Sequence, residues 1–407
     1  VLVYFVFIVL ALFFSLIFDR EEGYHGAKCI AYVAMCGFLV LIAGLRDGLG
    51  GDTFFYQRNY EYWYEGAMEN DLLSTLGWEL KHSGYMPLWS LVNIWVRQYS
   101  ASFVVFQLLH ALVVNGVICW VISRHSDRGF MFLLFYLLVG TFFLFNTEVM
   151  REGLAIAMTL VGIECFTTGR KGLFWVFVVL AVGFHISALV LLLYPFVRIG
   201  MSWATIGWAT LAAFGVWVVS DMLLTVAVSH SGALPEFLSF RLEGYAAFAT
   251  NFNGFLRFLL HFLLVPSVLI LYSMHGVDEE KECEWRERMV AFFLPLGIVA
   301  AAVPGFTRFT NYVMVFELMA LAEVSRMLFE EQRHLLVRGG SVVAFVLLYM
   351  WSLLTYYPQN DFYMYEFYAP YTSVFNKDEV EKNRREMAHL ESCSNDWGDA
   401  GARNIEQ

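Results

Sequence analysis

The sequence predicts an all-α, polytopic integral membrane protein with about 10–11 transmembrane helices, one re-entrant helical hairpin and a short polar C-terminal tail. Hydrophobic residues make up 59 % of the 407 residues and charged residues only 15 %, whereas soluble domains are about half apolar and a quarter charged. Apolar runs of roughly 17 to 22 residues recur, and about 20 such residues cross the bilayer core as a helix. A chain of this length could form two or three soluble domains, but the repeated runs favour the membrane class.

The apolar runs define the expected spans in order. The first run, 2–18, has neither a basic n-region nor a small-residue cleavage site, so we expect a retained span rather than a signal peptide. Residues 87–98, PLWSLVNIWVRQ, are too short and too polar to cross and are expected to lie along the interface. The predicted spans are 2–18, 30–45, 103–122, 130–145, 149–166, 203–219, 254–273, 289–303, 309–327 and 341–357.

The apolar segment between Lys171 and Arg198 has two interpretations. It is either one long span or two half-helices broken around Gly183–His185. Basic residues of short loops face the cytoplasm. If the N-terminus is outside, the basic loops in the second half of the chain also face the cytoplasm only when 173–197 enters and leaves the membrane on the same side. We therefore favour a re-entrant hairpin, which indicates a cavity because non-helical backbone at membrane depth needs protein or water around it. The inner basic clusters are then Arg20/Lys28, Arg124/Arg128, Arg170/Lys171, Lys281/Arg286/Arg288 and Arg326/Arg333/Arg338.

The chain divides into a membrane domain at 1–375, with a large extracytoplasmic loop at 46–102, and a polar, partly disordered tail at 376–407. Six scattered cysteines show no Cys/His spacing, so neither a metal site nor a disulfide framework is indicated. The formal net charge of −11 argues against a nucleic-acid partner. No cofactor is expected.

Polar side chains from distant parts of the sequence converge on the outer leaflet. An ionisable group inside a span costs about 3 kcal/mol at the helix centre and by default marks a functional site. A single arginine at a helix end is usually a snorkelling anchor, and a single buried histidine is more often structural. Because several of these ionisable residues are expected at the same depth in the outer leaflet, we favour a functional site. The candidate residues are Arg46, Asp52, Arg151, Glu152, His185 and Arg308, with Glu148 beside Arg151.

These residue types suit a lipid-linked sugar carried on pyrophosphate. A guanidinium matches phosphate bidentately and stays charged. Carboxylates and tyrosines suit sugar hydroxyls, and a carboxylate or histidine can accept a proton from an attacking hydroxyl. The glycines of Gly48–Gly51 are only a weak phosphate-loop signal, because neither a preceding strand nor a Gly-Lys-Ser/Thr triplet accompanies them.

Five short motifs occur in a fixed order over nearly all of the predicted membrane region. They are Arg46-Asp-Gly-Leu-Gly-Gly-Asp52-Thr-Phe-Phe-Tyr56, Asn146-Thr-Glu-Val-Met-Arg151-Glu-Gly-Leu-Ala155, His185-Ile-Ser-Ala-Leu189, Arg308-x-x-x-Tyr312 and Pro370-Tyr-Thr-Ser-Val-Phe375. In this set the chain resembles the EpsG-type polysaccharide polymerases, relatives of the Wzy O-antigen polymerases. Two residues depart from the family pattern: Gly51 stands where threonine is usual, and Glu152 where glutamine is usual.

The resemblance implies a multi-pass glycosyltransferase of the bacterial inner membrane. It would polymerise undecaprenyl-pyrophosphate-linked repeat units at the periplasmic face, for O-antigen, capsule or exopolysaccharide. Arg46, Arg151 and Arg308 would stabilise the leaving pyrophosphate, while Asp52, Glu152 or His185 would deprotonate the acceptor. The substrate-binding residues would be Gly50, Tyr56, Asn146, Ser187, Tyr312 and Tyr371. The implied partners are the lipid-linked oligosaccharide, membrane lipid, a flippase and a chain-length regulator. No acidic D-x-D cluster occurs, so a metal-independent reaction is expected.

Two other function classes stay open. A transporter or flippase of lipid-linked sugars would also carry broken helices and charges within the membrane, but inverted repeats are typical of transporters and the sequence shows none. An oligosaccharide ligase or membrane acyltransferase is the third interpretation.

Overall fold

The computed structural model describes residues 2–19, 23–64, 72–82, 85–230, 251–274, 280–331 and 367–397. Over these ranges the chain is helical apart from connecting segments and an isolated bridge between Arg46 and Ser373. The predicted all-α class is confirmed. The predicted span 341–357 lies outside the described residues.

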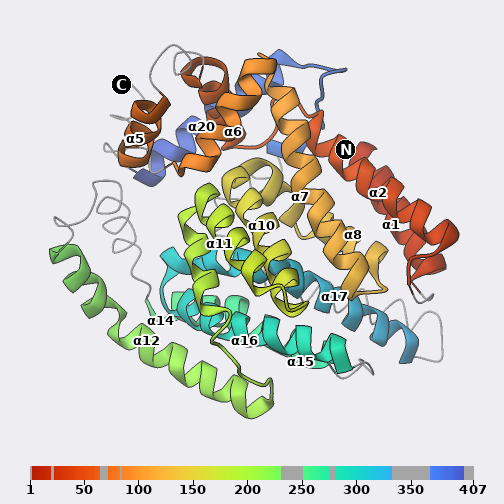
Figure 1. Ribbon diagram of the computed structural model, residues 1–407, viewed down its shortest axis with the longest axis vertical. Helices are drawn as coiled ribbons and strands as arrows, with labels where there is room; N and C mark the ends of the chain where they lie inside the picture. The colour runs from red at the N-terminus through yellow and green to blue at the C-terminus, as the bar shows by residue number, and fades with distance from the viewer. Residues whose placement is uncertain are drawn as a thin grey trace.

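The N-terminal helices form one flank of the molecule (Figure 1). Leu2 and Phe5 are 74 % and 60 % exposed although both are apolar, as expected of a helix that is hydrophobic on every face and lies against lipid. In this region α1 packs on α8, and α2 packs on α7. The bounds are α1 Leu2–Phe18, α2 Gly26–Gly44, α7 Phe103–His125 and α8 Gly129–Leu138.

The segment predicted as a large loop, 46–102, is itself mostly helical. Residues 87–98, expected to lie along the interface, form part of helix α6, with Pro87 at its first position, where a missing N–H costs no hydrogen bond. Trp89 on α6 is buried while Tyr99 is 76 % exposed, so the helix is amphipathic. The other elements are α3 Thr53–Arg58, the π-helical η1 Asn59–Trp63 and α5 Leu72–His82; α6 is Pro87–Tyr99.

The span predicted at 130–145 corresponds to a bent pair of helices. α8 ends at Leu138, and the chain continues as α9 Thr141–Phe143 and the π-helical η2 Leu144–Glu148, bent by 78° from α8. Gly140 at the break has a φ of 89°, a left-handed conformation that glycine adopts without a steric penalty and that stops an α-helix. The bend turns Glu148 toward the loop that follows α2.

The hairpin predicted at 173–197 is confirmed. α11, Lys171–Phe184, ends at His185, and the 3₁₀-helix η3, Ile186–Leu193, follows it. The ring of Tyr194 then lies 6.0 Å from that of Phe174 near the start of α11, and 5.4 Å from that of Phe166 near the end of α10. Because the chain returns to the level at which it entered, α11 and η3 run as the two arms of a hairpin with His185 at its tip.

The remaining helices cover the hairpin and α10 from the other side. Figure 1 shows α10 and α11 at the centre and α12 on the flank opposite α1. The bounds are α10 Met150–Thr167, α12 Trp203–Ser229, α14 Phe252–Leu259, η5 Leu260–Leu264, α15 Val265–Met274, α16 Glu280–Ala302, η6 Pro304–Thr310, α17 Asn311–Glu331 and α20 Glu379–Trp397.

Among the described residues, four helices are long and apolar enough to cross a membrane, or five if the bent pair at α8–η2 counts as one span. They are Gly26–Gly44, Phe103–His125, Trp203–Ser220 and Phe252–Met274, and the shorter helices α1 and α11 are also apolar. The chain is therefore a polytopic membrane protein. The predicted count of about 10–11 spans refers to the whole chain. It includes 341–357, outside the described residues, and helices such as α10 that carry charges at their ends.

Candidate functional site

The loop after α2 is held by the segment that precedes α20. The backbone N–H of Asp47 donates to the carbonyl of Thr372 at 3.1 Å, and the N–H of Val374 donates to the carbonyl of Leu45 at 3.0 Å. Segments more than 300 residues apart in sequence thus meet at one end of the helix bundle. We call the end that carries residues 46–52, α3, α6 and α20 the loop end (Figure 1).

Gly50, predicted to bind substrate, makes a close contact within the protein. Its φ is 90°, and a Cβ built on it would lie 2.6 Å from Cβ of Thr147. Its N–H donates to the carbonyl of Phe367 at 3.0 Å. A side chain at this position would separate the loop from η2, so Gly50 allows the loop to approach Glu148.

Glu148 fixes the next two residues of the loop. Its carboxylate oxygens accept hydrogen bonds from the backbone N–H groups of Gly51 at 2.9 Å and Asp52 at 3.0 Å. The hydroxyl of Tyr368 also donates to this carboxylate. Backbone N–H groups at the start of a helix lack intrahelical acceptors, so a carboxylate is favoured there. Glu148 thereby holds Asp52 at the first turn of α3.

Four predicted residues form a charge cluster at the loop end. Asp52 lies within electrostatic range of Arg151 and Arg308, and Glu152 lies within range of the same two arginines. Glu152 is only 1 % exposed, the side chain of Asp52 is 44 % exposed, and Arg308 is exposed. The cluster therefore extends from the buried carboxylate of Glu152 to the exposed guanidinium of Arg308. It joins the residue that precedes α3 with residues of α10 and η6.

Asp52 has a shifted ionisation. Removal from water raises the pKa of its carboxyl to about 7, and the negative charge of Glu148 adds to the rise, while Arg308 and Arg151 oppose it. Because 44 % of the side chain is open, water still reaches one side of the carboxylate and moderates this rise. The group changes its charge near neutral pH, which suits a general base.

Arg151 lies against the ring of Tyr85. Its guanidinium is 4.3 Å from the ring centroid of Tyr85, a cation–π geometry. Tyr56, predicted to bind substrate, lies within electrostatic range of Arg151 and is 5 % exposed. The Tyr56 hydroxyl donates to the carbonyl of Glu148 at 3.2 Å.

His185, Ser187 and Tyr312 form a buried hydrogen-bonded row. Nδ1 of His185 lies 2.5 Å from Oγ of Ser187, and this Oγ lies 2.8 Å from the hydroxyl of Tyr312. Residue 311, next to Tyr312, is an asparagine whose Nδ2 donates to Oε1 of Glu152 at 3.3 Å. The tip of the hairpin is thus linked through α17 to the charge cluster.

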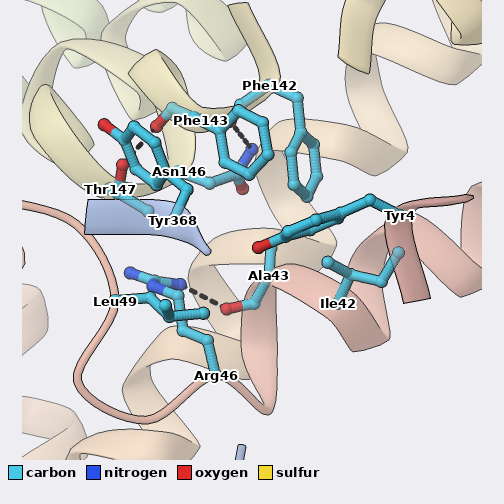
Figure 2. A pocket seen from close by; sticks show the side chains of 10 residues that line it. All are labelled: Tyr4, Ile42, Ala43, Arg46, Leu49, Phe142, Phe143, Asn146, Thr147 and Tyr368. Atoms are coloured by element: carbon cyan, nitrogen blue, oxygen red, sulfur yellow. Dashed lines mark hydrogen bonds between the residues drawn. The ribbon is translucent and has the colours of Figure 1, made fainter. Parts of the chain in front are cut away.

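Arg46 is enclosed by the end of α2, Thr53 and Met150. Its side chain is buried, and it donates hydrogen bonds to the carbonyl of Ala43 and, at 3.4 Å, to Oγ1 of Thr53. Burial lowers the pKa of Arg46 to about 10, which leaves it charged at neutral pH. Figure 2 shows its guanidinium next to Leu49, with the hydrogen bond to the carbonyl of Ala43 as a dashed line. The residues drawn there line a cavity of about 10 Å³, room for one water molecule.

Two further predicted substrate residues also bind within the protein. Asn146 is fully buried and exchanges hydrogen bonds with Asn115 at 2.9 and 3.2 Å, and its Nδ2 donates to the carbonyl of Phe142 at 2.7 Å. Tyr371 donates its hydroxyl to the carbonyl of Ile42 at 3.0 Å. Asn146 thus stabilises the bend at η2, and Tyr371 stabilises the end of α2.

The structure adds residues that the sequence did not assign to the site. They are Glu148, which the sequence marked only as a neighbour of Arg151, Tyr85 beneath Arg151, Asn311 on Glu152, and His389 of α20, whose Nε2 lies 3.6 Å from Oδ1 of Asp52. Asn311 could have been suspected from its place inside Arg308-x-x-x-Tyr312. For Tyr85 and His389 no local pattern exists, because each acts only through a tertiary contact. No group of three or more His, Cys, Asp or Glu side chains suited to a metal occurs among the described residues.

Comparison with known proteins matches the chain to the EpsG family model over residues 29–373. The match includes the loop, η2, α10, the hairpin, η6 and the segment before α20, and it ends before α20 begins. No curated protein and no solved structure matches the chain. Since the matched part is far more than half of the 407 residues, the chain belongs to the EpsG family, a family of polysaccharide-polymerase-type membrane proteins.

Proposed function

We propose that this protein is a glycosyltransferase of the bacterial inner membrane that polymerises undecaprenyl-pyrophosphate-linked oligosaccharide repeat units at the outer face. The single observation that carries the proposal is the charge cluster of Asp52, Arg151, Glu152 and Arg308 at the loop end. Family membership supports the polymerase type. The lipid-linked substrate and the sidedness are our inference from the chemistry of these residues.

The two arginines suit the leaving pyrophosphate. Arg308 is exposed and donates no hydrogen bond to any residue that the structure describes, so its guanidinium is available to a ligand. Arg151 packs on the ring of Tyr85, which limits the entropy it loses on binding. Donors fixed where charge develops stabilise the transition state more than the ground state, and a guanidinium pairs with phosphate bidentately.

Asp52 is our choice for the base among the three candidates. Its carboxylate is partly open to solvent and its pKa is raised to about 7, whereas Glu152 and His185 are 1 % and 5 % exposed. Glu152 is held by Asn311, and His185 is engaged with Ser187. We assign Glu152 and His185 to positioning: they set the location of Arg308, Tyr312 and the hairpin tip.

The proposed reaction is a direct displacement. The oxygen of an acceptor sugar hydroxyl forms a bond to the anomeric carbon of the donor unit as the bond from that carbon to the pyrophosphate oxygen breaks. The pyrophosphate leaves on its lipid with the bonding electron pair, and its charge is met by Arg151 and Arg308. The hydroxyl proton passes to Asp52 and then to water at the open side of its carboxylate. No other reactant is needed.

The experiment that tests the proposal is deletion of the gene in its native host, followed by a gel of surface polysaccharide. Loss of the long-chain ladder with single repeat units retained on the surface acceptor is expected. Loss of both the ladder and the single units would assign the protein to a flippase or an earlier step. A normal ladder would show that the protein has no role in polymerisation. Complementation with the unaltered gene should restore the ladder, whereas an Arg308→Ala variant should not, although the protein is present. This comparison distinguishes loss of the site from loss of the protein.

A further inference from the structure

The C-terminal helix α20 packs directly on the loop that carries Asp52. The guanidinium of Arg385 is 1 % exposed and donates to the carbonyl of Gly48 at 3.0 Å, to Oγ1 of Thr372 at 3.1 Å and to the carbonyl of Pro370 at 2.7 Å. Figure 1 shows α20 at the same end of the molecule as α6. A segment that the sequence suggested was a polar tail, beyond the family match, is therefore part of the loop end.

One turn further along α20, His389 faces Asp52. Its Nε2 lies 3.6 Å from Oδ1 of Asp52, and the residue is 8 % exposed. The imidazole makes edge-to-face contacts with two aromatic rings, with centroid distances of 5.2 Å to Phe55 and 6.2 Å to Phe367. These rings fix the plane of the imidazole, so its nitrogen is directed by packing from α3 and from the segment before α20.

Gly51 provides the space that His389 occupies. A Cβ built at Gly51 would lie 2.8 Å from Nδ1 of His389 and 3.0 Å from Oε2 of Glu148. Any residue with a side chain at this position would bring its Cβ against the imidazole. The glycine in this chain and the histidine on α20 therefore fit each other, which indicates that the contact between His389 and the loop is built into this sequence.

Among the described residues, two carboxylates face the imidazole: Asp52 at the start of α3 and Glu148 at the end of η2. From its own helix, Arg385 and Glu386 lie one turn away. Removal from water lowers the pKa of His389, and Glu148 opposes this shift. The imidazole is therefore neutral at neutral pH and carries one N–H, which it can donate to a carboxylate.

We propose that His389 is a positioning residue for Asp52, donating Nε2–H to Oδ1 and holding the carboxylate toward the acceptor hydroxyl. The inference rests on the proposed function. A separation of 3.6 Å is longer than a hydrogen bond, and catalytic hydrogen bonds commonly tighten only when substrate is bound. Asp52 takes the acceptor proton, while His389 keeps its own proton throughout and donates the same hydrogen bond.

Two substitutions test the hydrogen-bond donor of His389 separately from the packing of its ring. His389→Phe keeps the contacts with Phe55 and Phe367 but removes the donor, whereas His389→Gln keeps a donor amide but removes the ring. Met387→Gln is the matched control, because Met387 is 58 % exposed on the same helix. The assay uses the full-length protein in liposomes, with lipid-linked repeat units extracted from the deletion strain, and records kcat, KM and the pH dependence of the rate.

We expect His389→Phe to lower kcat about 10- to 100-fold, as misplacement of a catalytic group does, with little change in KM. Loss of a hydrogen bond to the carboxylate raises its pKa, so the acidic limb of the rate profile should move to higher pH. His389→Gln should retain more activity than His389→Phe, and the acidic limb of its rate profile should lie closer to that of the unaltered protein. Met387→Gln should match the unaltered protein.

A His389→Phe protein with the original kcat and pH profile would overturn the inference, and so would a His389→Gln protein that is less active than His389→Phe, because packing alone would then explain the contact. The Arg308→Ala variant, assayed beside them, keeps the two proposals distinguishable. If Arg308→Ala is inactive while His389→Phe is normal, only the role of His389 fails. If the unaltered protein forms no polymer, the proposed function itself fails.

Discussion

The carboxylate of Glu148 accepts a hydrogen bond from the backbone N–H of Asp52 at 3.0 Å. One of these residues ends the π-helix η2 and the other precedes α3, so two segments about a hundred residues apart in sequence are fixed at the site by one side chain. The negative charge of Glu148 also contributes to the raised pKa of Asp52. Glu148 thus fixes the location of Asp52 and adds to the rise in its pKa that burial causes.

Replacing Glu148 by Gln should affect both properties. The amide has one acceptor oxygen instead of two, so one of the N–H groups of Gly51 and Asp52 loses its partner, at a cost of about 1–3 kcal/mol in the free energy of unfolding. Loss of the negative charge lowers the pKa of Asp52, and the acidic limb of the rate profile should move to lower pH. Thermal unfolding and the pH–rate profile measure these effects. Glu61→Gln, on the neighbouring η1, should change neither; an unchanged profile in Glu148→Gln contradicts the coupling.

Arg308→Lys should lose most of the polymerisation rate. Lysine keeps the positive charge but not the bidentate fork, and loss of one transition-state donor typically costs about 100-fold in kcat. Because Arg308 is exposed and donates no hydrogen bond to a described residue, the melting temperature should be unchanged. Arg58→Lys is the matched control, an exposed arginine on α3 at the same end. Equal activities in the two variants would place Arg308 outside the site.

The polymerisation rate should fall as the pH drops through about 7. The pKa of Asp52 is raised to about 7; below this value the carboxyl is protonated and accepts no proton from the acceptor, while above it the base is available. Asp52→Asn should remove this limb together with nearly all of the rate. Initial rates in buffers of constant ionic strength from pH 5 to 9 provide the measurement. A residual rate in Asp52→Asn that keeps the same limb would transfer the role to Glu152 or His185.

Gly50→Ala should destabilise the loop end. A Cβ at this position meets Cβ of Thr147 at 2.6 Å and the φ of 90° is unfavourable for alanine, so we expect a loss of about 1–3 kcal/mol in the free energy of unfolding. Gly77→Ala in α5 is the control: a Cβ there meets nothing within 4 Å, and alanine favours the helix by about 1 kcal/mol. Equal stability of both variants would show that the loop does not pack as closely on η2.

The orientation of the site can be tested by cysteine labelling in a chain whose six cysteines are replaced by alanine. Met387 lies on α20 at the loop end and Glu287 on α16, and both are exposed. In intact spheroplasts, Met387→Cys should react with an impermeant maleimide and Glu287→Cys should not. Labelling of Glu287→Cys alone would reverse the orientation and place the charge cluster at the cytoplasmic face. Labelling of both would be incompatible with the re-entrant path of the hairpin.

The sequence by itself determined that helices form and where most of them lie. The ends of α1, α2 and α10 fall within a few residues of the predicted spans, because the free energy of placing an apolar run in lipid depends on the local sequence alone. The break at His185 was also visible, since Gly183, a histidine and a serine interrupt a long apolar run. The arginines and carboxylates of the site were identifiable because ionisable groups at membrane depth are rare.

Tertiary structure alone decided which of these charges meet. Asp52, Arg151, Glu152 and Arg308 come together, whereas Arg46 is buried against Ala43 and Thr53. The side chains that support them, Glu148 and His389, belong to segments whose positions follow from the bend at Gly140 and the docking of α20 by Arg385. Hydrogen bonds and ion pairs between distant segments depend on sub-ångström placement of both partners, and no local periodicity encodes that placement.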